Sequence, residues 1–148
     1  MAHILVIDDE DGVLASVKRR LEREGYHVTA ADTASGGIEL ISKSEAPFDV
    51  IVTDMSIEDP DAGLRVLQAA FARDLFAEVI VMTAFGNVAN AVECMRRGAF
   101  DYIEKNVPGV DTYEELTVKV DDALERRRRD VYTVELWERA ARSKERMP

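Results

Sequence analysis

Five polar side chains of this chain follow short apolar runs, and their types would allow them to act together: Asp8, Asp9, Asp54, Thr83 and Lys105. Converging carboxylates require a cation, because two of them about 4 Å apart repel by about 4 kcal/mol at an effective dielectric constant of about 20. Hard carboxylate oxygens that are open to water suit Mg²⁺ better than zinc. With a lysine and a hydroxyl to contact further oxygens, the set is equipped for phosphoryl transfer, and Asp54 is the candidate nucleophile.

The segments that carry these residues predict a parallel sheet. Five apolar or β-branched runs are typical of buried parallel strands, and they lie at 3–7, 26–31, 48–53, 79–82 and 100–104. Five helical patterns alternate with them, two of which should end at Gly25 and Gly98. The alternation predicts an α/β fold with helices on both faces of the sheet. Because parallel strands end at the same edge, the polar residues can converge although the sequence separates them widely.

Composition excludes several classes of function. The chain has 148 residues, a size that suits one domain, and no apolar run approaches the roughly 18 residues of a membrane span. The N-terminus lacks a signal-peptide pattern, so we expect a cytoplasmic protein. The net charge of −10 argues against a general nucleic-acid surface. Cys94 is the single cysteine, zinc-ligand spacing is missing, and so are the GxGxxG and GxxxxGK[ST] nucleotide-binding signatures.

Four motifs at the ends of the predicted strands resemble the receiver domain of two-component response regulators. They are Val6-Ile7-Asp8-Asp9-Glu10, Val52-Thr53-Asp54, Met82-Thr83-Ala84 and Gly98-Ala99-Phe100-Asp101-Tyr102-Ile103-Glu104-Lys105. The resemblance covers roughly residues 1–124, and the region from Thr83 to Tyr102 looks most like receivers of nitrogen-regulatory activators. It implies the chemotaxis-regulator fold, a doubly wound sheet with strand order 2-1-3-4-5.

The resemblance also implies the roles of individual residues. Mg²⁺ would be bound by Asp8, Asp9, Asp54 and the backbone carbonyl of Ser56. Asp54 would accept a phosphoryl group from a histidine kinase or a phosphotransfer protein, and Lys105 would contact that group. A domain of this kind catalyses only its own phosphorylation and dephosphorylation, so we expect a regulatory protein rather than an enzyme.

The same resemblance implies a switch. Thr83 would swing toward the phosphate while Tyr102 turns inward, which would change the surface formed by the fourth helix, the fifth strand and the fifth helix. Phosphorylation adds about −1.5 to −2 charges, enough to bias a two-state element and so alter the binding of a downstream protein.

The chain departs from the family pattern in two loops beside the predicted site. Asn106 stands where the family usually has a proline, often after a cis bond, so the peptide here should be trans, or else strained by about 3–4 kcal/mol. The stretch between Lys105 and Leu116 is some residues longer than usual, and the loop at 55–63 is one residue longer and contains Glu58, Asp59 and Asp61. Both loops border the site, so partner recognition could differ.

Two alternative functions fit parts of the sequence. The departures motivate a pseudo-receiver, an interaction module whose binding is independent of phosphate. The run Asp9-Glu10-Asp11-Gly12-Val13-Leu14 after an apolar strand also resembles the nucleophile motif of haloacid-dehalogenase phosphatases, with Asp9 as nucleophile and Asp11 as acid/base. That alternative does not explain Asp54, and the chain is short and lacks a cap insertion.

The last 24 residues differ in charge from the rest of the chain, and we treat 1–124 as the receiver domain and 125–148 as a helical tail. Residues 1–124 have a balance of −13, whereas 125–148 contain 5 acids and 8 Lys or Arg, a balance of +3. We expect Arg126–Arg129 to lie near a helix's carboxyl end on a solvated surface. The apolar residues beyond them could pack on the receiver, form a homodimer, or begin a linker to an output domain. No complete DNA-binding unit fits this segment, so direct DNA binding is not expected.

Overall fold

Five parallel strands alternate with five helices in the computed structural model, which describes residues 1–145. The strands are β1 (His3–Ile7), β2 (His27–Ala31), β3 (Val50–Asp54), β4 (Glu78–Ala84) and β5 (Asp101–Lys105). The helices are α1 (Asp11–Arg23), α2 (Ala34–Lys43), α3 (Ala62–Arg73), α4 (Ala89–Arg96) and α5 (Thr112–Glu145). Among these residues, no helix has the length and apolar character needed to cross a membrane.

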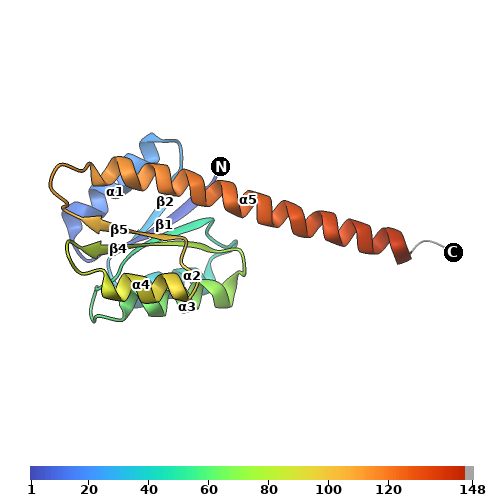
Figure 1. Ribbon diagram of the computed structural model, residues 1–148, viewed down its shortest axis with the longest axis horizontal. Helices are drawn as coiled ribbons and strands as arrows, with labels where there is room; N and C mark the ends of the chain where they lie inside the picture. The colour runs from blue at the N-terminus through green and yellow to red at the C-terminus, as the bar shows by residue number, and fades with distance from the viewer. Residues whose placement is uncertain (146–148) are drawn as a thin grey trace.

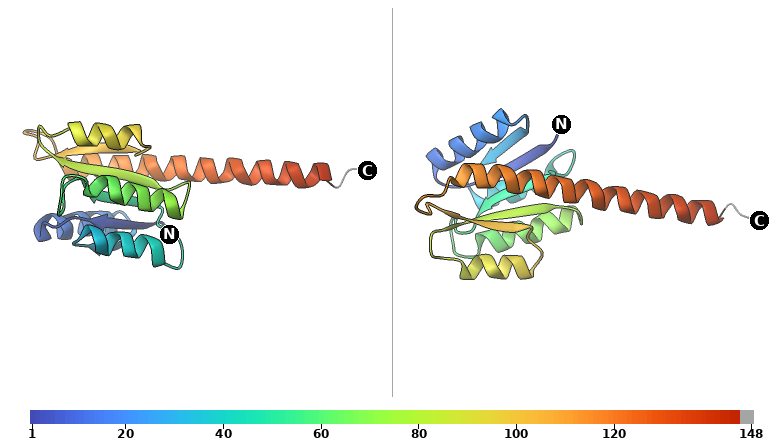
Figure 2. Two further views of the ribbon diagram at one scale, coloured as in Figure 1. Left: turned by 90° about the horizontal axis from the view of Figure 1, so that it is seen from below. Right: turned by 45° about the horizontal axis from the view of Figure 1, so that its top comes forward.

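The strands form one sheet in the order β2-β1-β3-β4-β5, and every neighbouring pair is parallel. Helices α1 and α5 cover one face of the sheet, and α2, α3 and α4 cover the other (Figures 1 and 2). This arrangement confirms the predicted doubly wound α/β fold, its strand order and its long C-terminal helix.

The strands are apolar on both faces because helices cover both faces. Alternate residues of a strand point to opposite sides. Thus Leu5 and Ile7 of β1 pack with the α2, α3 and α4 side, whereas Ile4 and Val6 pack with the α1 and α5 side. All five residues of β3 are buried, so the strand that ends at Asp54 is held rigidly in the centre of the sheet.

The predicted glycine helix ends are confirmed at Gly25 and Gly98. Both have a left-handed backbone, with φ of 95° and 105°, which glycine adopts without the steric cost of a Cβ atom. At Gly98 the backbone N–H donates to the Met95 carbonyl, and the next N–H donates to the Cys94 carbonyl. These bonds satisfy carbonyls that the end of α4 would otherwise leave without partners.

The expectation for the arginine run was wrong for two of its four residues. Helix α5 does not end there, and Arg126 and Arg127 turn back onto the sheet edge opposite the predicted site. The Arg126 Nε donates to Glu78 Oε1 at 2.9 Å, and its guanidinium lies 4.6 Å from the centre of the Phe100 ring. Arg127 pairs with Asp49 at 3.1 Å and with Asp74 at 2.6 Å.

A buried carboxylate explains why Arg126 packs against the sheet instead of pointing into solvent. Glu78 begins β4 and is only 2% exposed, so its charge needs a cation, which a helix passing over the strand can supply. Burial raises the pKa of Glu78, and Arg126 acts in the opposite direction by bonding its charged form. Arginine suits this place because its planar guanidinium can donate two bonds to one carboxylate.

We expect Arg126→Met to lower the free energy of unfolding by about 2 kcal/mol at pH 7, because Glu78 is left buried without its partner. The deficit should shrink as the pH falls toward 4.5, the ordinary pKa of this carboxyl, because a raised folded-state pKa penalises only the ionised form. Denaturant titrations at the two pH values measure both effects. The exposed Arg129→Met is the matched control and should change stability by less than about 0.5 kcal/mol. Equal losses in the two variants would contradict the assignment.

Candidate functional site

The predicted site residues lie at the carboxyl edge of the sheet, as the strand register requires. Asp54 pairs with Met82, directly before Thr83, and Lys105 pairs with Ala84. On the other side of β3, Ile7 pairs with Thr53, so Asp8 follows at the level of Asp54. Three neighbouring strands and the end of β5 therefore deliver their polar residues to one place.

Lys105 is the centre of the site. Its Nζ donates to Asp8 Oδ2 at 2.7 Å and to Asp54 Oδ2 at 3.0 Å, and it lies 3.6 Å from Glu10 Oε1. Lys105, Asp8 and Asp54 are all buried. A single ammonium group thus neutralises part of a cluster of three carboxylates.

Burial and neighbouring charges shift the pKa values of Asp54 and Lys105. Burial raises the pKa of Asp54, the hydrogen bond and charge of Lys105 oppose this, and the charge of Asp8 adds to it. Burial alone would lower the pKa of Lys105, but its bonds to Asp8 and Asp54 outweigh burial and hold that pKa above its ordinary value. Lys105 therefore stays protonated and favours the ionised form of Asp54.

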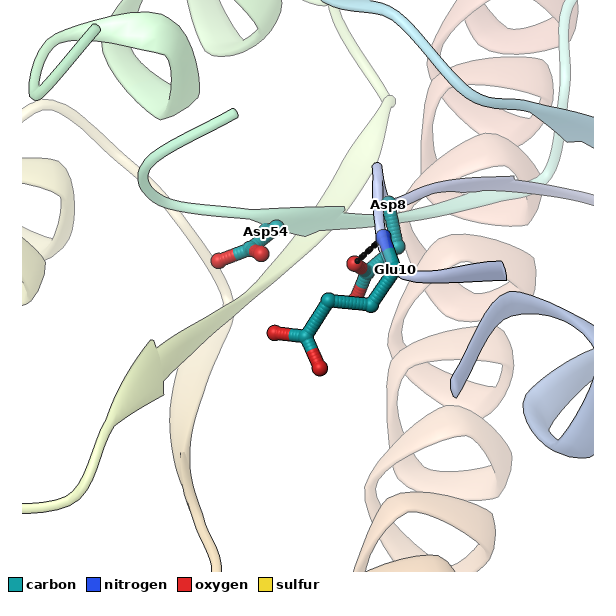
Figure 3. A group of neighbouring side chains, drawn as sticks. All are labelled: Asp8, Glu10 and Asp54. Carbon is teal, nitrogen blue, oxygen red and sulfur yellow. Dashed lines mark hydrogen bonds between the residues drawn. The ribbon is translucent and has the colours of Figure 1, made fainter. Parts of the chain in front are cut away.

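Three carboxylates could hold a metal ion together. Ligand oxygens of Asp8, Glu10 and Asp54 lie within 4.8 Å of one another (Figure 3). The Asp8 carboxylate also accepts the backbone N–H of Glu10 at 2.9 Å, which fixes its orientation. With Lys105 included, the four groups leave two net negative charges, and hard oxygen donors with that charge fit Mg²⁺.

The sequence predicts Asp9 as a metal ligand and does not single out Glu10, yet Glu10 is the third carboxylate of this cluster. Asp9 is exposed, and its carboxylate is not among the three that approach one another. Chain geometry accounts for the difference, because Glu10 has an extended backbone with φ of −87° and ψ of 105°, and alternate residues of an extended segment point to the same side. Glu10 belongs to the acidic run Asp8-Asp9-Glu10-Asp11, so the residue type is visible in the sequence, but the direction of its side chain is not.

The loop after Asp54 holds Ser56 beside the site. The backbone N–H of Ser56 faces Asp54 Oδ1 at 3.4 Å. The neighbouring Met55 is buried, and its N–H donates to the Met82 carbonyl at 2.8 Å. Further along, Glu58 accepts the N–H of Ala34 at 3.0 Å. The lengthened acidic loop is thus tied to the start of α2 as well as to β4.

Neither residue of the expected switch is among the groups that Lys105 contacts within residues 1–145. Thr83 is buried, and its hydroxyl donates to the backbone carbonyl of Asn87 in the loop before α4. The same loop is tied to β5, because the Gly86 N–H donates to Glu104 at 3.1 Å. Tyr102 is half-buried and packs against the apolar layer under α2, α3 and α4.

Asn106 replaces the usual proline with a residue in the left-handed backbone region, which turns the chain directly after Lys105. Among residues 1–145 there is no cis peptide bond, and Asn106 has a left-handed backbone with φ of 59°. Asparagine tolerates this region better than most residues other than glycine. The trans alternative is therefore correct, and the chain turns away directly after Lys105 while its ammonium group still reaches both carboxylates.

Comparison with known proteins agrees with this geometry. The family model described as the response regulator receiver domain matches residues 4–117, which include every residue of the site. The chain belongs to the response regulator receiver domain family. A receiver structure from Clostridium thermocellum is 31% identical, with a TM-score of 0.77, and the match covers 86% of this chain and 98% of that one.

Curated relatives of this receiver are longer regulatory proteins. The photosynthetic apparatus regulatory protein RegA of Rhodobacter capsulatus is 31% identical over 78% of this chain and 61% of its own length. The transcriptional regulatory protein GlrR of Escherichia coli is 29% identical over 84% of this chain but only 26% of its own length. NtrX from Brucella abortus is a structural neighbour with 27% identity and a TM-score of 0.81, covering 93% of this chain and 30% of that one.

Proposed function

We propose that this receiver is phosphorylated on Asp54 and that the phosphate switches a protein-binding surface. The observation that carries the proposal is the contact of Lys105 with both Asp8 and Asp54, at 2.7 and 3.0 Å, in a buried acidic cluster. The ammonium group of Lys105 therefore lies beside Asp54, where it can neutralise an oxygen of a phosphoryl group bound there. The phosphodonor would be a histidine kinase or a phosphotransfer protein, and the output would pass to a downstream protein.

The reaction requires a carboxylate nucleophile and a means of spreading charge. A carboxylate oxygen of Asp54 attacks phosphorus, the new oxygen–phosphorus bond forms, and the nitrogen–phosphorus bond of the donor phosphohistidine breaks. The imidazole leaves with that electron pair. Lys105 neutralises one phosphoryl oxygen, and rigid placement of Asp54 at the end of the buried β3 aligns the attack.

Asp8, Asp54 and the Ser56 carbonyl are the ligands that we propose for Mg²⁺, with Glu10 as a further carboxylate. Asp9 remains a proposed ligand on the strength of the family motif alone. Bound Mg²⁺ would supply positive charge to the phosphoryl oxygens during transfer. Ionised carboxylates are needed for this, so weak acid should reduce metal binding.

The switch would start at Thr83. Without phosphate, the Thr83 hydroxyl donates its hydrogen bond to the Asn87 carbonyl. It must give up that hydrogen bond before it can donate to a phosphate on Asp54. Releasing Asn87 would free the loop before α4, and movement of Thr83 would allow Tyr102 to turn inward. Phosphorylation would therefore change the surface of α4, β5 and the first turns of α5.

The pseudo-receiver is the alternative that the longer loops favour. Both proposals are tested by incubating the protein with acetyl phosphate, with and without Mg²⁺, and measuring its intact mass. We expect the mass of one phosphoryl group to be added with Mg²⁺ and none to be added when a chelator removes it. No added mass under conditions that label an ordinary receiver would support the pseudo-receiver instead.

A further inference from the structure

The second half of α5 extends beyond the receiver as a free arm (Figures 1 and 2). Every side chain from Tyr132 to Glu145 is exposed, so the expectation that this region could pack on its own receiver is wrong for the described residues. Isolated helices of about 12–15 residues are marginal in water. The arm continues from an anchored helix, but it gains no packing of its own.

The arm carries a narrow stripe of the kind that pairs with another helix. Asp130, Val134, Trp137, Ala141 and Lys144 follow one another at intervals of 4, 3, 4 and 3 residues, which places them along one side of a helix. Trp137, the largest of them, is 73% exposed, and Val134 is 38% exposed. The stripe is apolar in the middle, with an acid, Asp130, at one end and a base, Lys144, at the other. If a second copy runs in the opposite direction, the acidic end of each stripe lies near the basic end of the other.

We propose that the arm, residues 130–144, pairs with the arm of a second copy in antiparallel orientation. In this arrangement Val134 packs against the partner's Trp137. Asp130 lies beside the partner's Ala141, which is small, and within reach of the partner's Lys144. A two-fold axis makes every contact occur twice, and the part shared by the two arms, residues 130–141, is about 18 Å long.

Charge decides the orientation. A parallel pair would set Asp130 against the partner's Asp130 and Lys144 against the partner's Lys144, and like charges across a helix interface are unfavourable. The antiparallel pair replaces both repulsions with two Asp130–Lys144 contacts. Lys144 also approaches the partner's Arg127 in this register, but the charge of that arginine is already neutralised by Asp49 and Asp74. It also places the two receivers at opposite ends of the paired arms, so their bodies do not compete for space.

The anchor at the base of the arm makes the pairing geometry reproducible. Arg126 and Arg127 fix the helix to Glu78, Asp49 and Asp74 one turn before Asp130. The arm is therefore presented in one direction rather than swinging on a flexible linker. Pairing of the arms is separate from the proposed function and does not depend on phosphorylation of Asp54.

Association is tested with the unphosphorylated full chain by sedimentation over a dilution series. We expect a reversible monomer–dimer equilibrium, and Trp137→Glu should raise the dissociation constant at least about 30-fold, as loss of a buried aromatic anchor does. Leu136→Glu is the matched control, because it adds the same charge at the next position, which lies off the stripe. A monomer at all concentrations, or equal loss in both variants, would overturn the proposal and leave the arm as a linker.

Orientation is tested by mixing two single-site variants, Asp130→Cys and Ala141→Cys, under mild oxidation. The native Cys94 is buried and does not interfere. We expect disulfides mainly between the two different variants, because antiparallel pairing brings position 130 beside position 141. Disulfides that form only between identical variants would show parallel pairing and contradict the proposal.

Discussion

Asp54→Asn is expected to accept no phosphoryl group from acetyl phosphate in the presence of Mg²⁺. An amide is not a nucleophile for this transfer, and Asp8, the other buried carboxylate that Lys105 contacts, is assigned to metal binding rather than to attack on phosphorus. Intact mass spectrometry measures the loss. The control is Asp61→Asn, an exposed acid of the neighbouring loop, which should be labelled like the parent. Residual labelling of Asp54→Asn at the parent rate would contradict the assignment.

The same variant should be more stable than the parent at pH 7 without Mg²⁺. Burial raises the pKa of Asp54 despite the opposing effect of Lys105, so the ionised carboxylate costs stability in the fold. For a raised folded-state pKa, the cost appears as the pH rises through that pKa and is absent below 3.8, the ordinary value. Denaturant unfolding should therefore show an advantage for Asp54→Asn at pH 7 that vanishes in acid. A variant less stable than the parent at pH 7 would contradict this account.

Lys105→Met should have the second large effect. Removing the ammonium leaves Asp8 and Asp54 buried and adjacent, and breaking a buried ion pair from one side costs about 3–5 kcal/mol. Phosphoryl transfer to Asp54 should slow about 100-fold, because one group that stabilises the transferred charge is missing. Chemical denaturation and the rate of mass gain measure the two effects.

Magnesium provides an internal check on Lys105→Met. If repulsion among carboxylates causes the loss, Mg²⁺ should restore more stability to this variant than to the parent, because the cation replaces the missing charge. The control Lys43→Met removes an exposed lysine that pairs with Glu39, and it should cost no more than about 1 kcal/mol. A parent-like stability of Lys105→Met in the absence of Mg²⁺ would show that the cluster does not need its lysine.

The sequence predicts the fold well because buried parallel strands consist of continuous apolar runs, which are visible in the sequence. β1 was placed correctly, and Gly25 and Gly98 marked helix ends through their backbone freedom. The predicted bounds of β4, 79–82, are too short at both ends, because the strand also includes the polar Glu78 at its start and Thr83 and Ala84 at its end. The charge of buried Glu78 is paired with Arg126, which lies 48 residues away in the chain, and sequence periodicity does not reveal such a pairing.

The site is only partly visible in the sequence. Strand order explains why Asp8, Asp54 and Lys105 meet, but the side toward which each residue of an acidic run points depends on backbone angles. For that reason the carboxylate that lies beside Asp8 and Asp54 is that of Glu10, which the sequence does not single out. The contact of Thr83 with Asn87 likewise depends on the path of a loop, which residue types alone do not determine.

The most direct test of the proposed function is to locate the phosphate. The protein is phosphorylated with acetyl phosphate and Mg²⁺ and then treated with borohydride, which reduces an acyl phosphate and leaves homoserine in place of the modified aspartate. Peptide mass spectrometry then reads the position. We predict homoserine at position 54 and at no other acidic residue. Reduction at Asp8, Asp9 or Glu10, or at no position in a protein that carries phosphate, would contradict the assignment of Asp54 as the acceptor.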